Sequence, residues 1–175
     1  MRAIDVKTSL KKLANPERAK GSERYFKTGK GQYGEGDIFI GVTVPLQRSV
    51  AHKYVTLSTA ETIKLLRSPI HEFRLTALFI LVEQYRKGDL AIKKEIADIY
   101  FQHRAYVNNW DLVDSSAPQI LGDYLFNRSS DKLTNLAKSQ SIWDRRIAIL
   151  ASFKWIDEAE YSFPISIISM LLNDR

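Results

Sequence analysis

The stretch Asn108-Asn109-Trp110-Asp111-Leu112-Val113-Asp114-Ser115 opens the helix around which the rest of the chain is organised. Asn109 is a favourable N-cap, and Trp110 and Asp114 lie one turn apart on the same helix face. The same face continues as an apolar stripe that we expect to be buried, formed by Val113, Ala117, Ile120, Leu121 and Tyr124. A carboxylate in such a stripe is costly unless a cation pairs with it. Asp114 is therefore either a structural ion-pair residue or a residue that takes part in chemistry.

Outward from this helix, the rest of the chain also has a helical pattern, divided by proline, glycine and capping residues. The expected helices span 3–13, 16–27, 44–54, 58–67, 70–87, 89–103, 110–126, 129–138, 141–156 and 163–172. Residues 28–37 contain four glycines and are expected to form a loop, without the spacing of a nucleotide-binding loop. The apolar run 38–40 is expected to be a packed extended segment, because no second convincing strand exists to pair with it.

The spacing of the strongest inner helices indicates the fold class. These helices begin near residues 70, 110 and 141, a period of roughly 30–40 residues, which is typical of HEAT and armadillo repeats. The sequence therefore predicts an all-α fold of HEAT-like repeats that form a curved α-solenoid with a concave basic face, in a single domain spanning residues 1–175. A globular helical bundle remains an alternative, since the repeats share no clear residue-level identity.

Charge is distributed unevenly along the chain. Residues 1–54 hold 11 Lys and Arg against 5 Asp and Glu, whereas residues 55–175 hold 15 of each, so the net charge of +6 arises in the first third. This excess indicates either a nucleic-acid partner or a solubilising surface. The sequence contains no cysteine, no membrane span and no signal-peptide pattern, and we expect a cytoplasmic protein.

A second charge lies on an apolar face in the helix 141–156. The expected inner arc of that helix contains Ile142, Ile149, Phe153 and Ile156. Arg146 projects into this arc, with Arg145 and Lys154 at its edges. A guanidinium there needs an anion, either Asp114 or a phosphate of a ligand. If the two helices are neighbours, Trp110, Asp114 and Arg146 converge on one patch, which is either a site or an ion pair that fixes helix register.

Other catalytic classes have little support. His52, His71 and His103 are scattered and lack metal-ligand spacing, and no Ser/His/Asp arrangement stands out. We therefore expect no metal and no cofactor.

Several stretches together resemble the DNA alkylation repair glycosylases of the AlkD type, a family with HEAT-like repeats. The matching stretches follow the family's order: Glu23-Arg24-Tyr25-Phe26-Lys27-Thr28-Gly29, Phe39-Ile40-Gly41-Val42, Val44-Pro45 with Arg48, Asn109-Trp110-Asp111-Leu112-Val113-Asp114, and Trp143-Asp144-Arg145-Arg146 followed by Ala148-Ile149-Leu150. The block that contains Trp110 and Asp114, combined with the downstream block that contains Trp143 and Arg146, is the most specific part of the match.

The resemblance implies hydrolysis of the N-glycosidic bond of N3- and N7-alkylated purines in duplex DNA. By matching position, Asp114 is the catalytic carboxylate, Trp110 contacts the sugar of the lesion, and Arg146 holds DNA near the lesion. The resemblance assigns DNA contacts to four further residues, Tyr25, Arg48, Arg145 and Lys154. We therefore expect the partner to be alkylated double-stranded DNA, bound by a monomer with neither a metal nor a membrane.

Members of that family continue with further helices beyond the position of Arg175, so we expect this chain to lack the family's last helices. Apolar surface around Ile165, Ile168 and Leu172 would then be exposed. Two other functions remain open, a non-catalytic HEAT-like DNA-binding protein and a protein-interaction scaffold.

Overall fold

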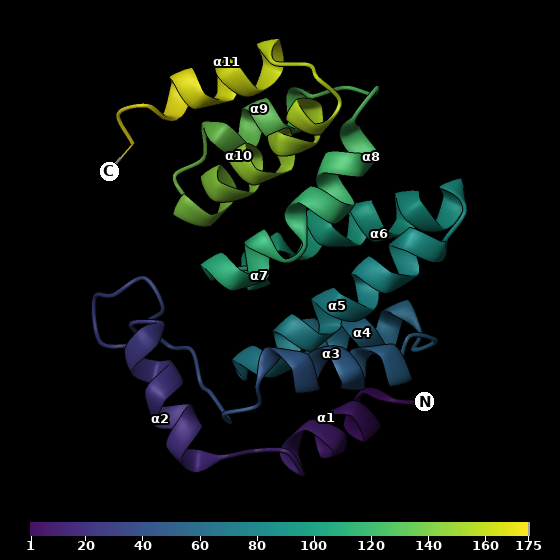
Figure 1. Cartoon of the computed structure of the whole chain (residues 1–175), viewed down its shortest axis with the longest axis vertical. Coiled ribbons are helices and arrows are strands. Elements are labelled where there is room, and N and C mark those ends of the chain that lie inside the picture. Colours follow the sequence, from purple (N-terminus) through teal and green to yellow (C-terminus); the bar gives the residue numbers. More distant parts are fainter. Residues whose placement is uncertain (175) are drawn as a thin grey trace. The chain divides into compact units, whose positions relative to one another are not determined.

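The computed structural model describes residues 1–174, and its regular structure is helical (Figure 1). The α-helices are α1 (Ala3–Lys11), α2 (Pro16–Tyr25), α3 (Val44–Lys53), α4 (Thr59–Leu66), α5 (His71–Lys87), α6 (Leu90–His103), α7 (Trp110–Asp114), α8 (Asp123–Leu125), α9 (Asp131–Ala137), α10 (Ile142–Asp157) and α11 (Ser162–Leu171). Arg104–Tyr106 is a 3-10 turn and Pro118–Gly122 a π-helical turn. The chain is therefore all-α, as predicted. It divides into two compact units, Met1–Lys87 and Gly88–Arg175.

The first unit is built around α5, which is buried on all sides along nearly its whole length. Helices α3 and α4 pack on it, and α1 contacts all three. Local signals set the ends of these helices. Asn15, for example, caps α2 by accepting a hydrogen bond from the N–H of Arg18, and Pro16 takes the first helical position. Among residues 1–174 the only β-type pairing is an isolated parallel bridge between Ile38 and Ile70, so residues 38–40 are an extended segment, as expected.

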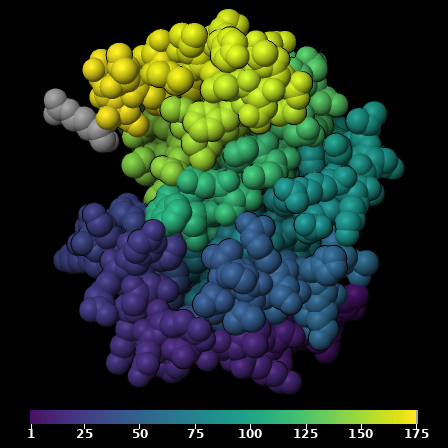
Figure 2. Space-filling view, in the orientation of Figure 1, coloured from purple at the N-terminus to yellow at the C-terminus, as the bar shows by residue number. Residues whose placement is uncertain are grey.

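The second unit has α10 at its centre. Helix α10 packs against α7, α9, α11 and the π-helical turn, while α6 contacts that turn and α8. In the space-filling view the side chains of α11, in yellow, lie at the surface of this unit (Figure 2). Ile165, Ile168 and Leu172 are all exposed, as expected. No helix within residues 1–174 is both long enough and apolar enough to cross a membrane.

The prediction of one continuous helix over 110–126 was wrong. Proline has no N–H to donate to a carbonyl four residues earlier, and its ring clashes with that carbonyl. Pro118 therefore prevents a regular helical bond to Asp114, and α7 ends at Asp114. The chain resumes through the π-helical turn and α8.

The predicted inner face of the helix 141–156 was also wrong. Ile142, Phe153 and Ile156 are exposed, and Ile149 is only partly covered. The buried face is formed instead by Ile147, Ala148, Ala151, Ser152 and Trp155. Helix α10 is apolar on more than one side, so contacts with its neighbours, and not its own pattern, decide which side is covered.

Candidate active site

Asp114 lies at the C-terminal end of α7, because Pro118 terminates the helix there. Asn109 starts the same helix and is fully buried, with its side-chain oxygen accepting the N–H of Trp110. The C-terminal end of a helix carries partial negative charge, so a carboxylate at this position gains no help from its own helix. Its stabilisation must come from a neighbouring element.

That stabilisation comes from Arg146 on α10. The guanidinium donates from Nε to Oδ1 of Asp114 and from Nη2 to Oδ2, both at 2.7 Å. About a third of each side chain remains exposed, 38% for Arg146 and 33% for Asp114. The hydrogen bond and the charge of Asp114 raise the pKa of Arg146, which therefore stays charged at every physiological pH. The pair is bidentate, accessible to solvent and held between two helices of one unit.

Tyr100 on α6 supports this arrangement from the buried side. Its hydroxyl lies 3.0 Å from Oγ of Ser116, which donates to the carbonyl of Leu112 in α7. Burial raises the pKa of Tyr100 far above its usual range, and the nearby charge of Asp114 adds to this effect. Tyr100 is therefore a neutral phenol that fixes the backbone of α7 immediately before Asp114.

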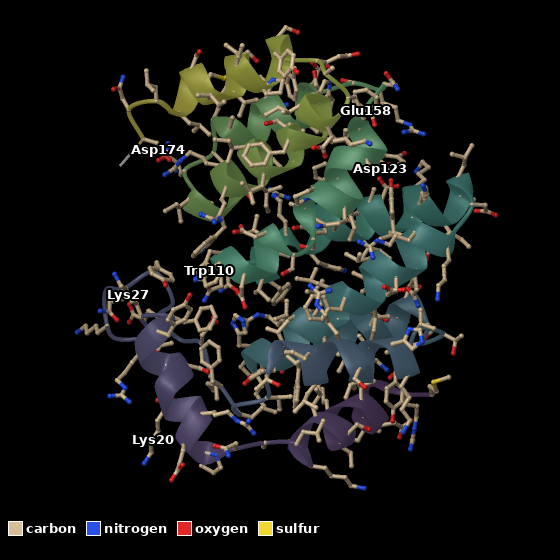
Figure 3. The ribbon with its side chains drawn as sticks, viewed as in Figure 1. Lys20, Lys27, Trp110, Asp123, Glu158 and Asp174 are labelled. Carbon is tan, nitrogen blue, oxygen red and sulfur yellow. The ribbon has the colours of Figure 1, made fainter. Side chains whose placement is uncertain are left out.

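Trp110 lies one turn before Asp114, at the N-terminal end of α7, where Figure 3 labels it. Its side chain is partly exposed. The second unit thus brings together on α7 and α10 the three residues that the sequence assigned to catalysis. An exposed carboxylate with a guanidinium partner and a nearby indole is an arrangement able to stabilise a cationic sugar and to contact a phosphate.

Arg145 and Lys154, the two other predicted contacts on α10, make local ion pairs. Arg145 donates from Nε to Asp174 at 2.7 Å and from Nη1 to the carbonyls of Ser139 and Gln140. Lys154 pairs with Glu158, which raises the pKa of Lys154. It lines a polar cavity of about 530 Å³ near Phe126.

The predicted contacts Tyr25 and Arg48 belong to the first unit. Tyr25, the last residue of α2, is 65% exposed and meets Phe26 edge to face. Arg48 on α3 is exposed, and its guanidinium lies 4.0 Å above the ring of Phe79. Both residues are exposed on helices of the first unit.

The sequence did not predict a buried polar network that binds the backbone of residues 40–42, just after the glycine-rich loop. The carboxylate of Glu72, only 2% exposed, accepts the N–H groups of Ile40, Gly41 and Val42 at 2.7–3.3 Å. Beside it, buried Asp37 pairs with His71 and Arg74. A charged residue in the buried register of an apolar helix was the available signal, but its partners lie about 30 residues away and are mostly backbone groups.

Comparisons with known proteins agree with the family resemblance. A family model described as DNA alkylation repair enzyme matches residues 6–175. A solved structure described as a predicted DNA alkylation repair enzyme from Enterococcus faecalis is similar with a TM-score of 0.63 and 14% sequence identity, over 93% of this chain and 76% of that one. At this identity the likeness shows the fold alone. A comparison with curated proteins finds no match.

Proposed function

Because the chain belongs to the DNA alkylation repair enzyme family, we propose that it is a DNA glycosylase that hydrolyses the N-glycosidic bond of N3- and N7-alkylated purines in duplex DNA. The observation that carries this proposal is the accessible Asp114–Arg146 pair, with Trp110 one turn away. Both side chains remain open to solvent, so a ligand can reach the pair, which a purely structural ion pair would not need.

The chemistry needs few catalytic groups. Alkylation at N3 or N7 makes the purine cationic, so the bond from C1′ to the base breaks with its electron pair moving to the base, without a strong general acid. The sugar is left with oxocarbenium character, as in other glycoside hydrolyses. The carboxylate of Asp114 stabilises that charge and orients a water molecule, whose oxygen bonds to C1′ while its proton passes to the carboxylate and then to solvent.

Arg146 has two tasks in this mechanism. Its bidentate bond holds the carboxylate of Asp114 in one orientation, and its exposed edge is suited to a phosphate next to the lesion. Trp110 adds an aromatic face to the cationic sugar, worth about 0.5–2 kcal/mol. We assign contacts with the DNA backbone to Tyr25, Arg48 and two residues of α10, Arg145 and Lys154.

The test measures release of 7-methylguanine and 3-methyladenine from alkylated duplex DNA. Asp114→Asn keeps the shape of the side chain and removes its charge, so we expect excision to fall by at least 100-fold, about 2.7 kcal/mol of transition-state stabilisation. The control is Asp123→Asn, which removes a partly exposed carboxylate of the same unit that pairs with Lys93 at 3.4 Å. Equal excision by wild type and Asp114→Asn would refute the proposed role of Asp114.

A second candidate is a DNA-binding protein without catalysis. Both oxygens of Asp114 are engaged by Arg146, which favours a purely electrostatic role for the pair. Duplex binding that falls steeply with salt, together with no detectable base release, would support this candidate. Absence of duplex binding even at low salt would instead favour a protein-interaction scaffold.

A further inference from the structure

A cavity of about 320 Å³ lies between α2 and the segment that leads into α3. Arg18, Gly21, Ser22 and Tyr25 line it from α2, and residues 41–43 line the other side. All of these residues belong to the first unit. We call this space the α2 cavity. Of its lining residues, only Tyr25 was assigned a contact with DNA above.

The residues that line the α2 cavity include several hydrogen-bond donors without a protein partner. Within residues 1–174, the Arg18 guanidinium, the hydroxyls of Ser22 and Thr43, and the N–H of Thr43 form no hydrogen bond or ion pair. The N–H groups of Gly41 and Val42 do not add to this set, because they are bound to Glu72. A guanidinium surrounded by hydroxyl and amide donors is suited to an anion with several oxygens, and a phosphate group is the best match.

Gly21 lines the cavity without adding a side chain to it. It lies within α2 and has no positive φ, so the helix itself does not need a glycine there, and glycine lowers helix stability relative to alanine. A Cβ added to Gly21 would meet no atom within 4 Å. No contact within the fold therefore excludes a larger residue, and the effect of glycine at this position is to leave room above the helix.

The surroundings indicate the source of the phosphate. Arg24, Lys27 and Lys30 are exposed at the end of α2 and in the glycine-rich loop, and Figure 3 shows Lys27 projecting from this loop. The first 54 residues carry the excess positive charge of the whole protein. A basic surface around a donor-lined cavity matches a polyanion better than a small metabolite.

We propose that the α2 cavity binds a backbone phosphate of duplex DNA. The guanidinium of Arg18 donates hydrogen bonds to the phosphate oxygens, and the ring of Tyr25 packs against the attached sugar. The cavity is larger than a phosphate group and leaves room for that sugar. The assignment to DNA, and not the phosphate chemistry, rests on the proposed function. The α2 cavity thereby gives the first unit its own anchoring point on the duplex.

Two variants and two matched controls test this in the full chain. Arg18→Gln removes the guanidinium that would bind the phosphate, and Gly21→Leu fills the α2 cavity without changing the charge. Lys20→Gln removes one positive charge from the same helix outside the cavity, and Gly21→Ala changes the same position with little loss of space. Affinity for unmodified duplex DNA is measured by fluorescence anisotropy across a salt series, and thermal melts show that each variant is folded.

We expect Arg18→Gln and Gly21→Leu to bind the duplex about five- to tenfold more weakly than wild type at low salt. Arg18→Gln should also reduce the log–log salt slope by about 0.9, the value for one phosphate contact. Both controls should stay within about twofold of wild type. The proposal is wrong if Gly21→Leu binds like wild type, or if Arg18→Gln weakens binding no more than Lys20→Gln.

A second measurement separates the two possible sources of phosphate. Inorganic phosphate and a deoxynucleoside monophosphate are titrated into the protein, and the backbone amide NMR signals of Gly21, Ser22 and Thr43 are followed. Shifts in these signals that disappear in Arg18→Gln support the phosphate site. If they occur while duplex affinity is the same in all variants, the DNA assignment is wrong. Because unmodified duplex is used, a loss of base excision in Asp114→Asn has no bearing on either result.

Discussion

Replacing Arg146 by glutamine separates the catalytic role that we propose for its pair with Asp114 from a purely structural role. The expected loss of stability follows from exposure. Fully exposed ion pairs contribute about 0.2–1 kcal/mol, whereas breaking a buried pair costs about 3–5 kcal/mol. The Asp114–Arg146 pair is bidentate but about a third exposed on both sides, so water can solvate Asp114 after Arg146 is lost. We therefore expect Arg146→Gln to lower the free energy of unfolding by about 1–1.5 kcal/mol.

The expected catalytic effect is larger. In the proposed mechanism Arg146 orients the carboxylate and contacts the DNA only in the complex, so its loss should lower single-turnover excision of 7-methylguanine by about 100- to 1,000-fold, or roughly 2.7–4 kcal/mol. A double-mutant cycle with Asp114→Asn then measures the coupling of the two side chains in urea unfolding and in excision. In excision we expect the double variant to be little worse than either single variant, because the two groups act together.

The opposite pattern would refute this reasoning. If Arg146→Gln lowers the free energy of unfolding by 3 kcal/mol or more, and the protein that remains folded still excises at the wild-type rate, the pair fixes the packing of α7 on α10. The control is Arg104→Gln, which removes a guanidinium that pairs with Asp144 at 3.1 Å and is 42% exposed. Arg104→Gln should lower the free energy of unfolding about as much as Arg146→Gln does, without lowering the rate of excision.

Three further predictions concern the first unit. Gly41→Ala should lower the free energy of unfolding, measured in urea, by about 3 kcal/mol, because φ is +77° and the new Cβ would lie 2.1 Å from the carbonyl oxygen of Asn15. Gly31 also has a positive φ, +75°, but open space around it, so Gly31→Ala should lower this free energy by only about 1 kcal/mol. Glu72→Gln should cost about 2 kcal/mol by the same measurement, because an amide cannot accept three N–H groups as a carboxylate does; an unchanged midpoint would contradict this. Lys64 and the N–H of Ala3 lower the pKa of Glu61 in the folded state. Ionised Glu61 therefore stabilises the fold above the unfolded-state pKa of a glutamate, and this contribution is lost as pH falls through the folded-state pKa. Melting temperatures between pH 5 and pH 3 should therefore fall more in wild type than in Glu61→Gln.

The sequence predicted the helices well because their ends are set by nearby residues. Pro16 and Asn15 begin α2, and Ser141 begins α10 by accepting the N–H of Asp144. Each signal acts within one helical turn, so it can be read without knowing the neighbours. The error at Pro118 has the same local character, since an internal proline predicts a break at the preceding turn. The apolar pattern beyond it was given too much weight.

The face of α10 could not be predicted in the same way. Ile142, Phe153 and Ile156 form as regular an apolar stripe as Ile147 and Trp155, and only the packing partners distinguish them. The Glu72 network was missed for a related reason, because its acceptor and donors meet only through the tertiary fold. Asp114 and Arg146 were found because each is a charge within an apolar pattern, a signal that does not depend on which face is covered.

The break at Pro118 links the fold to the proposed chemistry. A continuous helix over 110–126 would place Asp114 in mid-helix, where its side chain would point toward the covered stripe of Val113 and Leu121. Ending α7 at Asp114 puts the carboxylate at a helix terminus, where it stays accessible but is disfavoured by the partial negative charge of the helix end. Arg146 offsets that charge while leaving a third of the carboxylate open to solvent. A carboxylate that stabilises a cationic sugar needs both properties, a fixed orientation and an open side. In this chain Arg146 binds both oxygens of the Asp114 carboxylate, and about a third of the Asp114 side chain stays open to solvent, as the proposed role requires.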